Sequence, residues 1–210
     1  MGRLPFGPNG PLIGKLGKMS GASWKGTYYV RSLPESTVRK PSEGQAVQRA
    51  RLSTASRFLK PMKELLAISF QYPGMTGYNR ALSYVLKNAV YGSYPDYRIH
   101  YPSVIISQGD LPNALEPSAT AGGNGQLVFT WTDNSDMGKA GPRDTILMLV
   151  YCDTIRQCNF RMVDITRSSG KAVYDLAPYK GLTVQTWLGF ISEDRKDISP
   201  GVFTGEVLIS

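Results

Sequence analysis

Apolar residues between positions 42 and 92 repeat with the period of a helix. Ala46, Ala50, Thr54 and Phe58 lie four residues apart, which is the spacing of one helical face. Ser42 with Gln45 three residues later is typical of a helix start, and Pro61 is expected to end this helix near Leu59. A second pattern begins after Thr76 and forms one stripe: Ala81, Leu82, Val85, Leu86, Ala89 and Val90. We therefore predict two packed helices, separated by a short segment after Pro61.

The pattern changes after residue 100 to short runs with strand character. Apolar residues alternate at 127, 129 and 131, and residues 146–151 are apolar throughout. The expected strands are 104–107, 126–131, 145–151, 159–163, 172–176, 183–191 and 202–209. About seven short strands with frequent turn signals between them are typical of a two-sheet β-sandwich.

The first 26 residues follow neither period. Their seven glycines and three prolines disfavour regular structure, so we expect a basic arm without a core of its own, followed by a short strand at 27–30. Because the arm is too apolar for a solvated tail, it needs a surface, which is its own body, another copy or a polyanion. The residues expected to be buried there are Leu12, Ile13, Lys15, Leu16, Lys18, Trp24 and Lys25.

Together these patterns predict an α+β chain in three parts. Residues 1–41 form the Gly/Pro-rich basic arm and connector, 42–102 a helical subdomain, and 103–210 an antiparallel β-sandwich of the immunoglobulin or fibronectin type. With 210 residues, of which 41% are hydrophobic, the chain can bury a sizeable core.

The net charge of +8 is unevenly distributed. Residues 1–63 contain 12 Lys/Arg and two acidic residues, whereas 64–210 contain 12 Lys/Arg and 14 acidic residues. Such asymmetry indicates an anionic partner or an acidic patch on a neighbouring subunit. Nucleic acid is one such partner, but no recognition motif accompanies the charge, which alone supports only non-specific binding.

Acidic residues gather in two expected loops. The first holds Asp133, Asp136 and Asp144, and the second holds Glu193, Asp194 and Asp197. In a seven-stranded sandwich these loops fall at the same end and would form one acidic tip. Since aspartate is common in turns for conformational reasons, we expect no metal site. A basic arm and an acidic tip suit head-to-tail assembly of copies.

Residues able to carry catalysis are scarce. His100 is the single histidine, which excludes His-based triads and two-His metal sites, and no phosphate-binding loop is recognisable. We expect no catalytic residue and no cofactor. Cys152 and Cys158 either form a disulfide across a hairpin or remain two reduced thiols.

Four segments carry a family resemblance: GKLGKMSGASWKG (14–26), KPSEGQAVQRARLSTASRFLKP (40–61), FTWTDNSDMGKAGPRDTILMLVYC (129–152), and WLGFISEDRKDIS (187–199) with the later FTG (203–205). From end to end the chain resembles a family of uncharacterised bacterial proteins carrying a domain of unknown function. Gly44 departs from the family's helix start. The resemblance implies no activity and no catalytic residue. Separately, the strand pattern of 126–209 is similar to fibronectin type III domains, which implies binding or scaffolding more than catalysis.

The leading hypothesis is a non-enzymatic structural protein that self-assembles into a filament or array, with the arm packing on a neighbour or adding a strand to it. The alternatives are a nucleic-acid-binding accessory or virion protein that uses the basic module, and a cell-surface binding module. The sequence shows no transmembrane run and no Sec-type signal. We expect an extracellular or cell-surface filament, with a virion or the cytoplasm as open alternatives.

Overall fold

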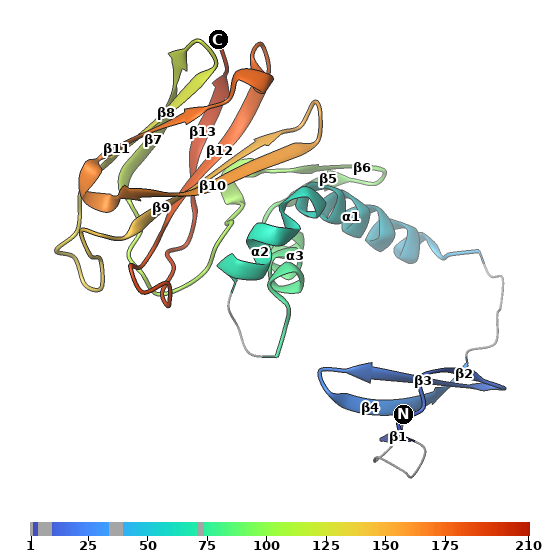
Figure 1. Ribbon diagram of the computed structural model, residues 1–210. Coiled ribbons are helices and arrows are strands. Elements are labelled where there is room, and N and C mark those ends of the chain that lie inside the picture. Colours follow the sequence, from blue (N-terminus) through green and yellow to red (C-terminus); the bar gives the residue numbers. More distant parts are fainter. Residues whose placement is uncertain (1, 4–9, 34–39, 71–73) are drawn as a thin grey trace. The chain divides into compact units, whose positions relative to one another are not determined.

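A computed structural model describes residues 2–3, 10–33, 40–70 and 74–210. The chain divides into two compact units, Met1–Ser42 and Glu43–Ser210 (Figure 1).

The N-terminal unit is a four-stranded antiparallel sheet of order β1-β4-β3-β2. Its strands are β1 Gly2–Arg3, β2 Gly14–Leu16, β3 Met19–Trp24 and β4 Thr27–Ser32. The expectation of an irregular segment is therefore wrong for 14–24, although the strand at 27–30 is confirmed. The glycines supply turns between strands instead of preventing them: Lys25 and Gly26 both have left-handed φ angles, 48° and 78°, as a two-residue hairpin turn requires.

Three helices open the second unit. They are α1 Glu43–Leu59, α2 Lys63–Ser69 and α3 Gly77–Asn88, and both predicted helices are confirmed. Pro61 lies in the 3₁₀ turn Lys60–Met62 that separates α1 from α2. At the start of α3, the Thr76 hydroxyl accepts a hydrogen bond from the Asn79 backbone N–H at 3.3 Å, which satisfies one of the otherwise free amides of the first turn.

A hairpin that the sequence pattern did not predict follows α3. Strand β5 (Val90–Ser93) pairs with β6 (Asp96–Ile99). Gly92 lies within β5. Further 3₁₀ turns occupy Tyr101–Ser103, Arg167–Ser169 and Ala177–Tyr179.

Seven strands form the predicted antiparallel sandwich. They are β7 Leu115–Gly123, β8 Gln126–Thr132, β9 Thr145–Cys152, β10 Gln157–Thr166, β11 Lys171–Asp175, β12 Thr183–Ile191 and β13 Val202–Leu208. One sheet has the order β10-β9-β12-β13 and the other β11-β8-β7. The α+β class with an antiparallel sandwich is confirmed. The strand predicted at 104–107 is wrong, because Val104 and Ile106 are buried in an irregular segment.

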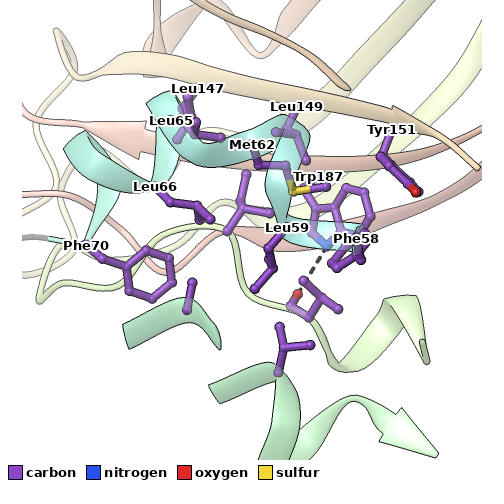
Figure 2. Packing of buried hydrophobic residues seen from close by; sticks show 14 of the residues in the cluster. Phe58, Leu59, Met62, Leu65, Leu66, Phe70, Leu147, Leu149, Tyr151 and Trp187 are labelled. Atoms are coloured by element: carbon purple, nitrogen blue, oxygen red, sulfur yellow. Dashed lines mark hydrogen bonds between the residues drawn. The ribbon is translucent and has the colours of Figure 1, made fainter. Parts of the chain in front are cut away.

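In the four-stranded sheet of the sandwich, the central strands β9 and β12 are buried on both faces. Ile146, Met148 and Val150 of β9 pack toward the second sheet, whereas Leu147 and Leu149 pack toward the helices. Figure 2 shows the helical side of this core, where side chains of α1 and α2 meet those of β9 and β12. Burial on both faces explains why β9 is an uninterrupted apolar run. The segments 42–102 and 103–210, expected as separate domains, thus share one core within a single compact unit.

None of the helices in the described ranges is both long and apolar enough to span a membrane.

Candidate functional site

Strand register divides the N-terminal sheet into two chemically different faces. Leu16 pairs with Met19, and Val30 pairs with Gly21, two residues beyond Met19. Paired residues share a face and successive residues alternate, so Leu16, Met19, Tyr28 and Val30 lie together. Leu12 covers Gly21 on this side, because its carbonyl occupies the space of a Gly21 side chain. We call Leu12, Leu16, Met19, Tyr28 and Val30 the apolar face.

The opposite face carries the charge. Ser20 pairs with both Lys15 and Arg31, Ala22 pairs with Tyr29, and Trp24 follows on the same side of β3. We call Lys15, Trp24, Tyr29 and Arg31 the basic face. The seven residues expected in one contact are therefore divided: Leu12 and Leu16 on the apolar face, Lys15 and Trp24 on the basic face, Lys18 and Lys25 in turns, and Ile13 ahead of β2.

Among residues 10–33, few side chains cover the apolar face. Gly21 is the only fully buried residue in the range 10–33. Leu16 is 58% exposed and Met19 is 48% exposed. A small sheet needs a packed hydrophobic face to be stable, so this face is a candidate contact surface.

The two acidic loops lie beside each other. Arg143 Nη1 is 3.3 Å from Glu193 Oε1, and Lys139 Nζ is 3.7 Å from Asp197 Oδ1. Both ion pairs join the first loop to the second. The structure therefore brings the predicted tip residues to one end of the sandwich.

This tip is close to neutral, because basic residues alternate with the acids. Lys139, Arg143, Arg195 and Lys196 lie in the same two loops. Asp133 accepts a hydrogen bond from the Ser135 backbone N–H at 3.0 Å, and Asp136 is exposed. Hydrogen bonds from the Ser192 hydroxyl and the Lys196 N–H lower the pKa of Asp194 to about 2. The head-to-tail hypothesis thus loses its electrostatic support, and the described residues contain no cluster of acids, histidines and cysteines suited to a metal.

Asp144 is not part of the exposed tip. Its side chain is 5% exposed and forms a 3.0 Å ion pair with Arg167, whose side chain is fully buried. Arg167 also donates to Asn134 Oδ1 at 2.6 Å and to the Pro112 carbonyl at 3.0 Å, and its guanidinium lies 4.0 Å from the centre of the Phe190 ring. Burial lowers the pKa of Arg167, and the Asp144 carboxylate offsets part of this effect. Sequence reasoning missed this structural network, because the partners of Arg167 are 23 to 55 residues away along the chain.

Both cysteines are free thiols. Cys158 pairs with Tyr151 across the β9–β10 hairpin, whereas Cys152 is next to Tyr151 in sequence and so points to the other face. The two thiols pack in different cores. The disulfide is therefore not formed, and the alternative of two reduced thiols is the one found.

Both thiols are expected to resist alkylation in the folded protein. Burial raises the pKa of Cys158 from its ordinary value of 9.0 to about 12, so the reactive thiolate is scarce at pH 8. Because the folded state favours the thiol, this contribution to stability is complete below pH 9.0 and is lost as the pH rises toward about 12. Iodoacetamide followed by mass spectrometry should show slow labelling of native protein and two adducts after unfolding in urea without reductant. Unfolded, unreduced protein that takes no label would demonstrate a disulfide instead.

A cavity in the second unit lies where α1, the β5–β6 hairpin and the β9–β10 turn meet. Its volume is about 420 Å³. Tyrosine and arginine side chains line it, and they come from positions 54–58, 91–101 and 151–156. Sequence reasoning missed this cleft because the three segments are distant along the chain. His100, nearby but not lining the cavity, is exposed, with Nδ1 2.7 Å from the Ser103 hydroxyl.

Residues 11–205 match the model of a family of unknown function, DUF6266. The chain belongs to this family. The expected family resemblance is thereby confirmed, and the DUF6266 description assigns no activity. No curated protein matches the chain.

Two solved structures show a limited likeness to this DUF6266 protein. One is a crystal structure of chicken CNTN1 FN1-FN3 domains, with 17% identity over 50% of this chain and 36% of that chain, at a TM-score of 0.39. The other is a solution structure of the fn3 domain of the human collagen alpha-1(XX) chain, with 11% identity over 50% of this chain and 91% of that chain, at a TM-score of 0.35. The likeness covers half of this chain in both cases.

Proposed function

We propose that this DUF6266 protein is a non-enzymatic structural protein that assembles with copies of itself, as a filament or array, through its N-terminal sheet. The observation that carries the proposal is the exposed apolar face. Leu16 and Met19 stand side by side on it, 58% and 48% exposed. Burying such side chains is favourable by about 1.5–3 kcal/mol each, and exposed apolar patches commonly mark interaction sites.

A second copy fits this face because the charges point away from it. Residues 10–33 contain four basic residues and no acid, so two N-terminal units in random contact would repel each other. Lys15 and Arg31 lie on the opposite side of the sheet. Two apolar faces can therefore meet without bringing these two charges together. The outer edge of β2 has no partner among the described strands, and it can pair with the same strand of a second copy.

Extension beyond a pair needs a second contact, for which β10 is suited. It is the outer strand of its sheet and, at 10 residues, the longest strand in the described chain. Among the described strands, none pairs with the outer backbone groups of β10, and such an edge accepts an added strand. When a strand of one copy is added to the β10 edge of the next, two different surfaces meet. Such a contact repeats without closing, which produces a filament.

Size-exclusion chromatography with light scattering on the full chain tests the proposal. The wild type is expected to form species larger than its 23.1 kDa monomer as concentration rises, with polymers visible by electron microscopy. Leu16→Ser combined with Met19→Ser should return the protein to monomer, because it removes the apolar contact. The matched control, Lys15→Ser with Trp24→Ser, changes two exposed residues on the opposite face and should assemble as the wild type does.

Two results would contradict self-assembly. A wild type that stays monomeric at every concentration excludes it. Larger species that dissolve on nuclease treatment, and that are lost in the control variant but not in the apolar-face variant, would show instead that the basic face binds nucleic acid.

A further inference from the structure

The tyrosine–arginine cleft of the second unit has an aromatic floor that is fixed by packing. The Phe58 ring stands edge-on to Tyr151, with 5.0 Å between ring centres, and Tyr101 lies 5.8 Å from Phe58. Trp187 packs against both Phe58 and Tyr101, with ring centres 6.4 Å and 6.3 Å apart, respectively. Figure 2 shows Phe58 beside Trp187, with Tyr151 at the edge of the cluster. Rings held in this way keep the floor open and pre-formed.

The one carboxylate that lines the cleft, Asp153, accepts a hydrogen bond from a tyrosine hydroxyl. Tyr151 donates to Asp153 Oδ1 at 3.2 Å, and the Asp153 carboxylate also raises the pKa of the Tyr101 hydroxyl. Burial and the neighbouring carboxylate raise the pKa of both tyrosines, so both hydroxyls stay protonated at neutral pH. Asp153 is therefore held in place, with remaining lone pairs free to accept from a ligand hydroxyl.

Three arginines surround this floor from three different elements. Arg57 comes from α1, Arg98 from β6 and Arg156 from the β9–β10 turn. All three are exposed, and none forms a salt bridge with another described residue. With Asp153 as the single acid lining the cleft, the walls carry an excess of positive charge that the fold itself does not use.

Arg156 has a backbone conformation that is unfavourable for an arginine. Its φ angle is 52°, in the left-handed region, where glycine or asparagine is more stable. The turn closes with the Arg156 N–H donating to the Asp153 carbonyl at 3.2 Å. The turn therefore places Arg156 and Asp153 in the same wall of the cleft.

We infer that the cleft binds a small ring-bearing anion, in which a phosphate or carboxylate group meets the arginines and a hydroxylated ring stacks on the tyrosines. Guanidinium groups form bidentate hydrogen bonds with phosphate and carboxylate. Tyr91 and Tyr97 also line the cleft, and their rings offer flat apolar surfaces to a base or a sugar. A volume of about 420 Å³ falls in the usual range for small-molecule sites. Two sources share this chemistry, nucleotides and acidic saccharides.

Isothermal titration calorimetry on the full chain separates the two sources. The probes are adenosine monophosphate and digalacturonate, each compared with its neutral counterpart, adenosine or a neutral disaccharide. We expect one anionic probe to bind at least about tenfold more tightly than its neutral counterpart, with an affinity that falls as salt is added. Absence of binding by both anionic probes at millimolar concentration would overturn the inference, as would equal binding of the neutral compounds.

Variants in the cleft test whether the arginines are responsible. Arg57→Gln and Arg98→Gln change exposed side chains and should each weaken binding about tenfold, with unchanged thermal unfolding. The matched control is Arg49→Gln, an exposed arginine of the same helix α1 that does not line the cleft, and it should bind as the wild type does. Equal loss in the control would overturn the assignment. The Leu16→Ser, Met19→Ser protein should bind normally, so this result and that of the assembly experiment are independent.

Discussion

Replacing Asp144 by alanine is expected to lower the free energy of unfolding by about 3–5 kcal/mol. The change leaves the Arg167 guanidinium buried without its carboxylate, while the Gly141 N–H loses the acceptor that it now reaches at 2.9 Å. Urea denaturation measures the effect. Asp136→Ala, in the same loop but exposed, should change stability by no more than about 0.5 kcal/mol.

A second pair of variants identifies the origin of the loss. When Asp144→Leu is combined with Arg167→Met, no unpaired charge stays behind, so the double variant should be more stable than Asp144→Ala alone. A single variant that loses less than about 1 kcal/mol would show that the ion pair behaves as a solvent-exposed one, contrary to its burial.

Trp187→Ala is expected to cost about 3–5 kcal/mol of folding free energy. Trp187 is fully buried at 0% exposure, contacts the rings of Phe58, Tyr101 and Phe203, and donates its indole N–H to the Val104 carbonyl at 3.1 Å. Its removal leaves a cavity between the helices and the sheet. Thermal or urea unfolding monitored by circular dichroism measures the loss.

The same measurement on Trp24→Ala provides the control. Trp24 is 57% exposed, so its replacement should change stability by about 0.5 kcal/mol at most in monomeric protein. Equal effects of the two substitutions would contradict the packing of Trp187 at the centre of the core.

In Trp187→Ala, Phe58 and Tyr101 also lose the side chain that they pack against, so the cleft should bind its ligand more weakly.

The sequence predicted the elements whose signal is local. The stripe from Ala81 to Ala89 indicated α3, and the apolar run at 145–151 indicated β9, because each pattern records which faces are buried. Strand β7 has no such signal. Its sequence, LEPSATAGG, is small and polar with mostly exposed side chains, so its strand geometry depends on hydrogen bonds with β8.

The features that matter most for function depend on tertiary pairing. Register decides that Leu16 and Trp24 lie on opposite faces of the N-terminal sheet, although both read as apolar residues of one segment. In the same way, register places Cys152 and Cys158 on opposite faces, whereas their spacing suggested a possible bridge. A shift of one residue would reverse each of these outcomes, and sequence spacing alone does not specify it.

Hydrogen exchange as a function of protein concentration tests the central claim, that the N-terminal sheet is the surface through which copies assemble. The amides of β2 and β3 lie in a segment, residues 10–33, in which almost no side chain is buried, so they should exchange quickly in dilute protein. We expect their exchange to slow as concentration rises and assembly covers the apolar face, while amides in β9 and β12 keep their strong protection throughout. Exchange of residues 14–24 that does not change with concentration, in samples that contain larger species, would contradict the account.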